Sequence, residues 1–116
     1  MATIRVSDYT SFINAVKTAD ADVILDSDLD ANGWTPQVTN WTCKSLDGGG
    51  HAIRNIQHRI TGGYSLFRLT RDGGCTISNT KFLNLVLTPG APWGSSFIYG
   101  ANGTNYIKNC EFQGLV

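Results

Sequence analysis

An internal repeat in the second half of the chain constrains its fold more than any other feature. Residues 65–86 (SLFRLTRDGGCTISNTKFLNLV) align without a gap on residues 95–116 (SSFIYGANGTNYIKNCEFQGLV) and are identical at eight of 22 positions. Chance matching at this composition would give roughly one or two identities. Self-similarity at a fixed period is typical of proteins whose units stack on their neighbours to share one core.

A weaker copy of the unit precedes these two, at a shorter offset. That offset aligns four residues of the earlier copy, Gly49, Gly50, Ile53 and Asn55, with Gly73, Gly74, Ile77 and Asn79. We therefore predict one domain, residues 1–116, with repeat units at 41–64, 65–94 and 95–116. The additional residues of the longer offset fall in the segment 87–94 (LTPGAPWG), whose prolines and glycines predict a surface loop.

Short strands are expected in every unit, because Val, Ile, Thr and Phe are prominent between glycine turns. Repeats of this length built from short strands predict an all-β solenoid whose core forms by stacking. The residues expected to stack are Ile53, Ile77 and Ile107 in one inward column, Phe82 on Phe112, and Phe67 on Phe97.

A single helix is predicted over residues 7–21 (SDYTSFINAVKTADA). Its hydrophobic residues recur at helical spacing at Phe12, Ala15, Val16 and Ala19. Ser7 or Asp8 can cap the first turn. Because a solenoid needs its ends covered, we expect this helix to cap the first unit.

The segment after the helix, residues 22–34 (DVILDSDLDANGW), alternates with a period of two. It predicts one strand that ends at Asn32-Gly33 and carries Asp26, Asp28 and Asp30 on one face. A calcium site is one interpretation of three carboxylates, but the sequence lacks the Gly and Glu that an EF-hand loop requires. We interpret the aspartates as a solvated edge that discourages strand addition.

The composition excludes several classes of partner. Nine Lys and Arg balance nine Asp and Glu, and 16% of the residues are charged, so we expect neither a nucleic-acid surface nor an electrostatic membrane anchor. The chain also has no apolar run near the roughly 20 residues of a membrane helix. Cys43, Cys75 and Cys110 show no metal-ligand or disulfide spacing and are predicted to be buried thiols.

Sequence motifs in the first half of the chain resemble those of a known protein family. FINAVK is followed by VILDSDLD, and LDGGGHAI comes after them at residues 46–53. Over almost its whole length the chain resembles the N-terminal part of a right-handed parallel β-helix of the pectate-lyase-like superfamily, most of all those of bacteriophage spikes and appendages. The resemblance implies about three coils, a capping helix and a stacked asparagine ladder at Asn55, Asn79 and Asn109. Lyases, hydrolases, epimerases, spikes and adhesins share this fold, so it specifies function poorly.

Candidate catalytic residues form no recognisable set. Asp47 and Asp72 each precede Gly and are interpreted as turn residues rather than as the carboxylate pair of a glycosidase. A lyase of the pectate-lyase-like superfamily would need carboxylates that bind calcium and a basic residue that removes a proton. The sequence contains one glutamate, Glu111, and no such set of residues. We therefore predict no enzymatic activity, no metal and no cofactor.

Histidines and arginines receive structural interpretations. His51 and His58 have no third ligand nearby in the sequence, so a solvated or structural role is preferred to metal binding. Four arginines are interpreted as surface charges rather than as ligands of uronate or lipopolysaccharide, namely Arg54, Arg59, Arg68 and Arg71.

Interface candidates come from tryptophans and from the last unit. Trp34, Trp41 and Trp93 lie in loop-like contexts, where an aromatic ring can stack on a sugar or anchor a protein interface. The last unit finishes at Leu115-Val116 without a polar cap, so it is expected to expose apolar surface and unpaired strand edges. The interface candidates are Trp93, Trp34, Trp41, Leu115 and Val116.

Together with the absence of a catalytic set, the resemblance implies a non-enzymatic bacteriophage virion protein, a capsid decoration, staple or spike component. It would assemble with itself as a dimer or trimer, or with capsid or spike proteins. The alternative is a carbohydrate-binding or polysaccharide-degrading β-helix, such as a tailspike or lyase fragment. Surface polysaccharide binding that depends on Trp93 or Arg68 would favour this alternative. A flat ice-binding surface is disfavoured because Thr70, Thr76 and Thr80 do not recur at the equivalent positions of the next unit.

Overall fold

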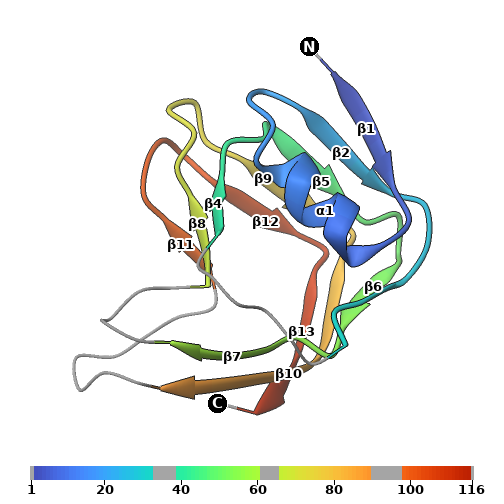
Figure 1. Cartoon of the computed structure of the whole chain (residues 1–116). Coiled ribbons are helices and arrows are strands. Elements are labelled where there is room, and N and C mark those ends of the chain that lie inside the picture. The colour runs from blue at the N-terminus through green and yellow to red at the C-terminus, as the bar shows by residue number, and fades with distance from the viewer. Residues whose placement is uncertain (1, 33–38, 61–65, 90–97, 116) are drawn as a thin grey trace.

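The computed structural model describes residues 2–32, 39–60, 66–89 and 98–115. In these ranges the chain forms one helix, α1 (Tyr9–Val16), and thirteen strands (Figure 1). Every pairing between these strands is parallel. The prediction of an all-β protein is therefore confirmed, and parallel sheets are its framework.

The strands form three sheets, which we name A, B and C. Sheet A contains, in spatial order, β1 (Thr3–Val6), β2 (Asp22–Leu25), β5 (Ser45–Asp47), β9 (Thr76–Ser78) and β12 (Tyr106–Lys108). Sheet B contains β3 (Leu29–Asp30), β6 (Ala52–Arg54), β10 (Lys81–Pro89) and β13 (Glu111–Leu115), and β7 (Gln57–Ile60) also pairs with β10. Sheet C contains β4 (Thr39–Trp41), β8 (Phe67–Leu69) and β11 (Ile98–Gly100).

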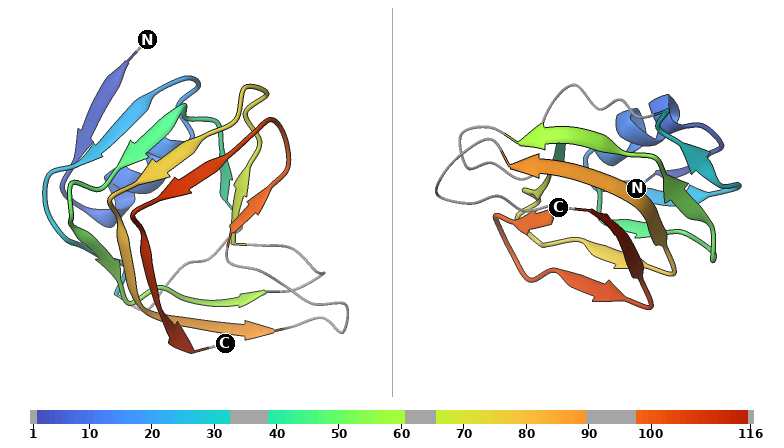
Figure 2. Two further views of the ribbon diagram at one scale, coloured as in Figure 1. Left: turned by 180° about the vertical axis from the view of Figure 1, so that it is seen from behind. Right: turned by 90° about the horizontal axis from the view of Figure 1, so that it is seen from below.

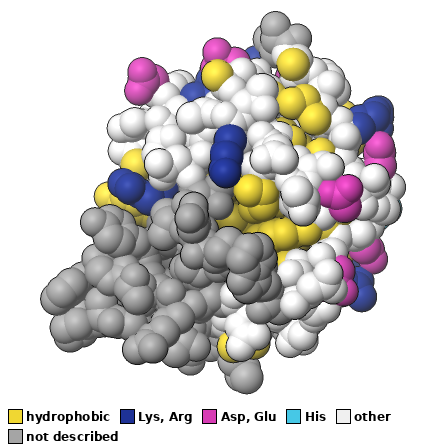
Figure 3. Space-filling model, viewed as in Figure 1, with side chains coloured by type: hydrophobic (Ala, Val, Ile, Leu, Met, Phe, Trp, Pro, Cys, Tyr) yellow, Lys and Arg dark blue, Asp and Glu magenta, His cyan; other side chains and the backbone are white. Residues whose placement is uncertain are grey.

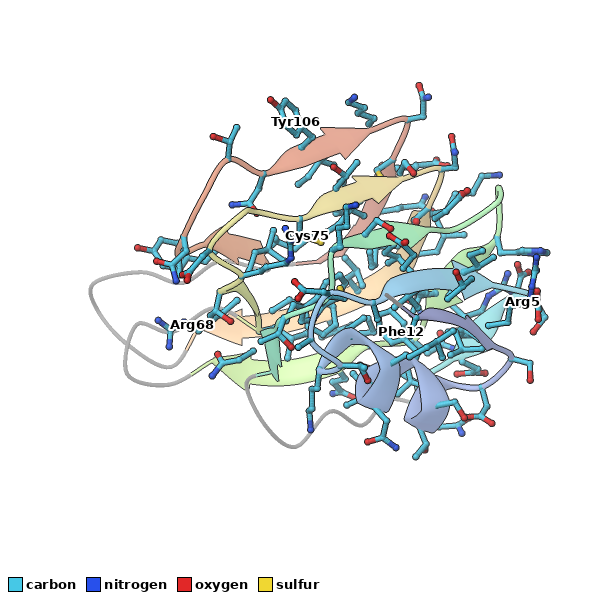
Figure 4. All side chains as sticks on the ribbon, turned by 90° about the horizontal axis from the view of Figure 1, so that it is seen from above. Arg5, Phe12, Arg68, Cys75 and Tyr106 are labelled. Carbon is cyan, nitrogen blue, oxygen red and sulfur yellow. The ribbon has the colours of Figure 1, made fainter. Side chains whose placement is uncertain are left out.

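The chain passes through the sheets in rotation, A then B then C, so strands far apart in sequence lie side by side. In sheet A, Ile77 lies opposite Ile107, and in sheet B, Phe82 lies opposite Phe112. Figure 4 shows the strands of sheet A as successive layers that run from the α1 side to β12. The last strand of each sheet therefore lies at the end of the molecule remote from α1.

The shorter offset predicted for the first copy is wrong. Ile77 lies opposite Leu46, and Ile53 lies opposite Phe82 in a different sheet, so both true offsets are close to that of the later repeat. Ile53 therefore does not share the column of Ile77 and Ile107. The sequence alignment of the first copy gave a wrong offset because it matched glycines from two different kinds of corner. The glycine run after β5 turns the chain from sheet A to sheet B, whereas the glycine pair before β9 turns it from sheet C to sheet A.

Several asparagines where the chain turns adopt the left-handed backbone conformation. Asn55, Asn79, Asn84 and Asn109 have φ between 53° and 63°, a conformation that Asn adopts at lower cost than most residues. The prediction of one ladder of Asn55, Asn79 and Asn109 is wrong, because these asparagines belong to two separate columns. Asn79 donates its backbone N–H to Lys108 O beside Asn109 (3.0 Å), whereas Asn55 accepts from Asn84 Nδ2 (2.6 Å).

Aromatic residues join α1 to sheet C in the core. Phe12, Trp41 and Phe67 are fully buried. Their ring centroids are 5.6 Å apart for Phe12 and Trp41, and 5.0 Å apart for Trp41 and Phe67. Figure 3 shows this side of the molecule, where hydrophobic atoms lie near the centre of the described surface and charged side chains of both signs are scattered around them. The helix thus covers the first end of the core, as expected.

The helix is shorter than the predicted segment 7–21. Asp8 is its N-cap and accepts a hydrogen bond from the Ser11 N–H at 2.7 Å, which confirms one of the two predicted caps. The helix ends at Val16, and Asp20 adopts a left-handed φ of 59° as the chain turns towards β2. Ala19 therefore lies outside the helix and is exposed. Among the described residues, no helix combines the length and the apolar character needed to cross a membrane.

The segment predicted as one aspartate-bearing strand forms two strands in different sheets, β2 and β3. Asp26 and Asp28 lie in the corner between them, where Asp26 accepts from Arg5 Nη1 at 2.8 Å. The prediction that Asp26, Asp28 and Asp30 share one strand face is wrong, because the chain leaves sheet A after Leu25.

Candidate functional site

The last strands of the three sheets form what we call the open end, residues 98–100, 106–108 and 111–115. In the described part of the chain, β11, β12 and β13 each pair on one side only, with β8, β9 and β10. The left panel of Figure 2 shows these strands around one face of the molecule, opposite α1. Such edges offer backbone N–H and C=O groups to which another strand can add.

Inward side chains of the open end are half exposed. Ile107 is 48% exposed, although Ile77 opposite it is fully buried. Phe112 is 46% exposed, although Phe82 opposite it is fully buried. The predicted stacking of Phe82 on Phe112 is present, with ring centroids 5.1 Å apart. The outermost layer therefore continues the apolar core to the surface.

Polar side chains flank these two apolar residues on the outer surface. Lys108 follows Ile107 and Glu111 precedes Phe112, so strand alternation points both charges away from the interior. Lys108 Nζ lies 5.1 Å from the ring centroid of Tyr106, which is 51% exposed and labelled on the outermost strand in Figure 4. Within the described ranges, neither Lys108 nor Glu111 forms an ion pair.

The predicted interface residues lie in different places. The interpretation of Trp41 as an interface anchor is wrong, because Trp41 belongs to β4 and is fully buried against Phe12. Leu115 lies in β13 opposite Val86 at the open end. Trp34, Trp93 and Val116 lie outside the described residues, as does Phe97, and the structure pairs Phe67 with Ile98. The exposed rings of Tyr99 and Tyr106 were not predicted, because single tyrosines in short strands have no distinctive sequence pattern.

A second surface is an open groove of about 270 Å³ beside sheet B, lined by Asp30, Asn32, Asn55, Ile56, Gln57, Asn84 and Val86. Three of these side chains form what we call the amide ladder. Asn84 Nδ2 donates to Asn55 Oδ1 at 2.6 Å, and Asn55 Nδ2 donates to Asp30 Oδ1 at 3.0 Å. The Asn32 N–H and the Asn55 amide hold the pKa of Asp30 below its ordinary value. The groove thus presents donors and acceptors suited to a hydroxyl-rich ligand.

Asp28 organises the corner between sheets A and B. It accepts hydrogen bonds from the Ala52 N–H (2.9 Å) and from Arg54 Nη2 (2.9 Å), and its Oδ1 lies 3.3 Å from His51 Nδ1. The Ala52 bond above all, with His51 and Arg54, holds the pKa of Asp28 below its ordinary value. Arg54 and His51 therefore have structural partners, which fits the interpretation of these residues from sequence.

Other candidate residues also take part in local structure. Asp47 Oδ1 accepts from the Gly49 N–H at 2.9 Å, as its interpretation as a turn residue requires. Arg71 Nε donates to Asp20 at 2.7 Å. Arg68 lies in β8 (Figure 4), and the side chains of His58 and Arg59 are outside the described part. In that part, no three His, Cys, Asp or Glu side chains are grouped so that they could hold a metal ion.

The cysteines are free thiols. Cys43 and Cys75 are buried, as predicted, with Sγ atoms 3.9 Å apart. The hydrogen bond between them, together with burial, raises the pKa of Cys43 and keeps its thiol protonated at neutral pH. Cys110 is only partly buried, at the corner between β12 and β13, so the prediction of burial is too strong there.

Comparisons with known proteins add no assignment to this geometry. No protein-family model matches the chain, and no curated protein and no solved structure matches it. Function must therefore be inferred from the open end and the groove.

Proposed function

We propose that this protein is a non-enzymatic structural component that assembles with other protein chains through its open end. The main support for the proposal is the exposure of two apolar side chains, Ile107 and Phe112. Each is half exposed, although the residue opposite it in the neighbouring strand, Ile77 or Phe82, is fully buried. Unpaired backbone groups beside such apolar side chains are the combination used when one chain adds strands to another. A catalytic role has less support, because Asp28 and Asp47 are engaged in corner hydrogen bonds.

The fold that we infer behind this surface is a short right-handed parallel β-helix of about three coils, capped by α1. The rotation through sheets A, B and C supports this inference. It gives coils at residues 22–41, 45–69 and 76–100 and the start of another at 106–115. Right-handedness follows from the general rule that about 98% of crossovers between parallel strands of one sheet are right-handed.

We further propose that the assembly belongs to a bacteriophage particle, as a capsid decoration, staple or spike component. Support for this location comes from the resemblance of FINAVK and VILDSDLD to phage spikes and appendages, and these residues form most of α1, most of β2 and all of β3. Mass spectrometry of purified particles released from cells that carry this sequence should detect the chain in stoichiometric amounts. Particles without it would contradict this location.

Light scattering coupled to size exclusion tests the role of the open end. The 116-residue chain is expected to form an oligomer as its concentration rises. Ile107→Lys should raise the dissociation constant by roughly a hundredfold, because it places a charge in the apolar contact. Asn14→Lys is the matched control, since Asn14 is exposed on α1 at the other end. A wild-type chain that stays monomeric at millimolar concentration, or equal effects of both variants, would contradict the proposal.

Carbohydrate binding is a second candidate function, favoured by the groove at the amide ladder. Its amide and carboxylate groups can bond sugar hydroxyls, and the partly exposed Val86 supplies apolar contact. A glycan array followed by calorimetry would test it with Gln57→Ala, which removes a groove side chain outside the ladder. Gln113→Ala at the open end is the control. Binding that Gln57→Ala abolishes and Gln113→Ala leaves intact would establish this function, and an array without signal would remove it.

A further inference from the structure

We propose that the partner at the open end is a second copy of this chain, related by a two-fold axis through the corner Asn109–Cys110. In this dimer, β12 of each copy pairs antiparallel with β13 of the other. The proposal rests on the proposed function, and it adds the identity of the partner and the register of the contact.

The sequence around this corner is self-complementary when one copy is read against another in the opposite direction. Residues 106–113 read YIKNCEFQ. An antiparallel register centred between Asn109 and Cys110 places Lys108 opposite Glu111 of the partner, and Ile107 opposite Phe112 of the partner. The two-fold axis repeats both pairs, because residue i contacts residue j and residue j contacts residue i. Two opposite-charge pairs and two apolar pairs thus form from one short segment.

The side chains in each pair point to the same side of the sheets. Directly opposed residues in an antiparallel pair lie on the same face. Ile107 and Phe112 both point inward, since each lies over a buried residue of the preceding strand. Lys108 and Glu111 both point outward by alternation. The apolar pairs would therefore extend the core across the interface, with the charge pairs on its rim.

Both charged residues are available for this contact. Lys108 and Glu111 are exposed, and within the described residues they take part in no ion pair. Lys108 is held over the ring of Tyr106, at 5.1 Å from its centroid, which places its ammonium group on the outer face of β12. An isolated surface charge contributes little to folding, so a contact between copies gives these two residues a role.

The two ends of the molecule differ in a way that favours a closed dimer over a chain of copies. A head-to-tail arrangement would require the open end of one copy to add to the first strands of the next. At that end α1 packs on β1, β2 and β4, and Phe12 fills the interior. The helix therefore obstructs continued stacking. Two open ends that meet through a two-fold axis bury both apolar surfaces and pair the free edges of β12 and β13.

Charge reversal tests the register. Lys108→Glu and Glu111→Lys should each raise the dimer dissociation constant about tenfold, because each replaces two attractive pairs by two repulsive ones. The double variant Lys108→Glu/Glu111→Lys should return to within about threefold of wild type. An equimolar mixture of the two single variants should form a heterodimer in preference to either homodimer, because both of its 108–111 contacts join a glutamate of one copy to a lysine of the other, whereas each homodimer has two contacts between like charges. Native mass spectrometry distinguishes the heterodimer by mass.

Cross-linking tests the position of the axis. With strands about 4.8 Å apart and a rise of about 3.3 Å per residue, the two Cys110 Cα atoms would lie on the order of 6 Å apart, within reach of a disulfide. Mild oxidation of the wild-type dimer should link two copies through Cys110, and Cys110→Ala should remove the link. The thiols Cys43 and Cys75 are buried and should not form intermolecular links.

The outcomes separate this proposal from the proposed function. An oligomer that Ile107→Lys disrupts, but whose affinity the double charge reversal does not restore, would retain assembly and overturn the two-fold register. A dimer whose dissociation constant neither single charge reversal changes would overturn it as well. A wild-type chain that is monomeric throughout would overturn the proposed function itself. Circular dichroism of each variant monomer confirms that the fold is intact, which these exposed positions should permit.

Discussion

The ring of Phe112 is stacked on the ring of Phe82, with centroids 5.1 Å apart and 9° between the ring planes, yet only Phe82 is fully buried. Two residues of the same type, at equivalent positions of neighbouring strands, therefore contribute to different properties. Phe82 stabilises the interior of the monomer. Phe112 packs on Phe82 and presents the exposed part of its ring as apolar surface at the open end.

The first prediction separates folding from assembly at this pair. Phe82→Ala should lower the free energy of unfolding by about 3–5 kcal/mol, because it leaves a cavity in the core. Phe112→Ala should lower it by only about 1 kcal/mol in dilute solution, since half of that side chain is already in water. Urea unfolding below the dimerisation concentration measures both. A larger cost for Phe112→Ala than for Phe82→Ala would contradict the assignment of Phe112 to the surface.

The second prediction concerns the amide ladder. Asn55 has a φ of 63° and bonds both Asp30 and Asn84. Asn55→Ala should cost about 2–3 kcal/mol of unfolding free energy, because it loses hydrogen bonds and places Ala in the left-handed region. Asn55→Gly tolerates that region and should cost about 1 kcal/mol less. Urea unfolding measures the difference, and equal costs for the two variants would show that the backbone conformation is not what selects Asn55.

The third prediction concerns acid stability. The pKa of Asp28 and of Asp30 lies below the ordinary value of 3.8 in the folded protein. Their stabilising effect is therefore complete above that pH and is lost as the pH falls through the lower native values. Asp28→Asn keeps an acceptor for Ala52 and removes the titrating group. Its urea midpoint should fall less than that of wild type between about pH 5 and pH 3, and parallel curves would contradict the role of Asp28.

The fourth prediction uses the cysteines. Cys110 should react with a small thiol reagent in the native protein, whereas Cys43 and Cys75 should react only after unfolding, because they are buried. Raised protein concentration should slow the labelling of Cys110 if the axis passes beside it. Mass spectrometry of digested protein assigns the labelled residue. Rapid native labelling of Cys43 would show that the core is not closed around it.

Much of the fold was predictable because stacking leaves a repeat in the sequence. The alignment of residues 65–86 on 95–116 placed Ile77 under Ile107 and Phe82 under Phe112, and the helix was visible from the spacing of Phe12 and Val16. The offset of the first copy failed for a physical reason. Glycines occur at two kinds of corner, and a short motif of Gly, Ile and Asn does not distinguish them.

The candidate site was predictable only in part. Apolar surface on the last unit was predictable from its sequence. The local context of a tryptophan does not show whether it is buried, and Trp41 packs with Phe12 and Phe67 because β4 lies beneath α1. The amide ladder was missed because Asn84 lies inside a strand, where a corner is not expected. The self-complementary segment 106–113 was present in the sequence, but its meaning depends on the knowledge that β12 and β13 are both edges.

The central claim is that the open end joins two copies of this chain. The most direct measurement is the mass of the 116-residue protein by light scattering across a concentration series, with Ile107→Lys measured beside it. The account predicts a change from monomer to a discrete dimer in wild type and a monomer in the variant. A wild-type protein that remains monomeric, or oligomers that grow without limit as the concentration rises, would contradict it.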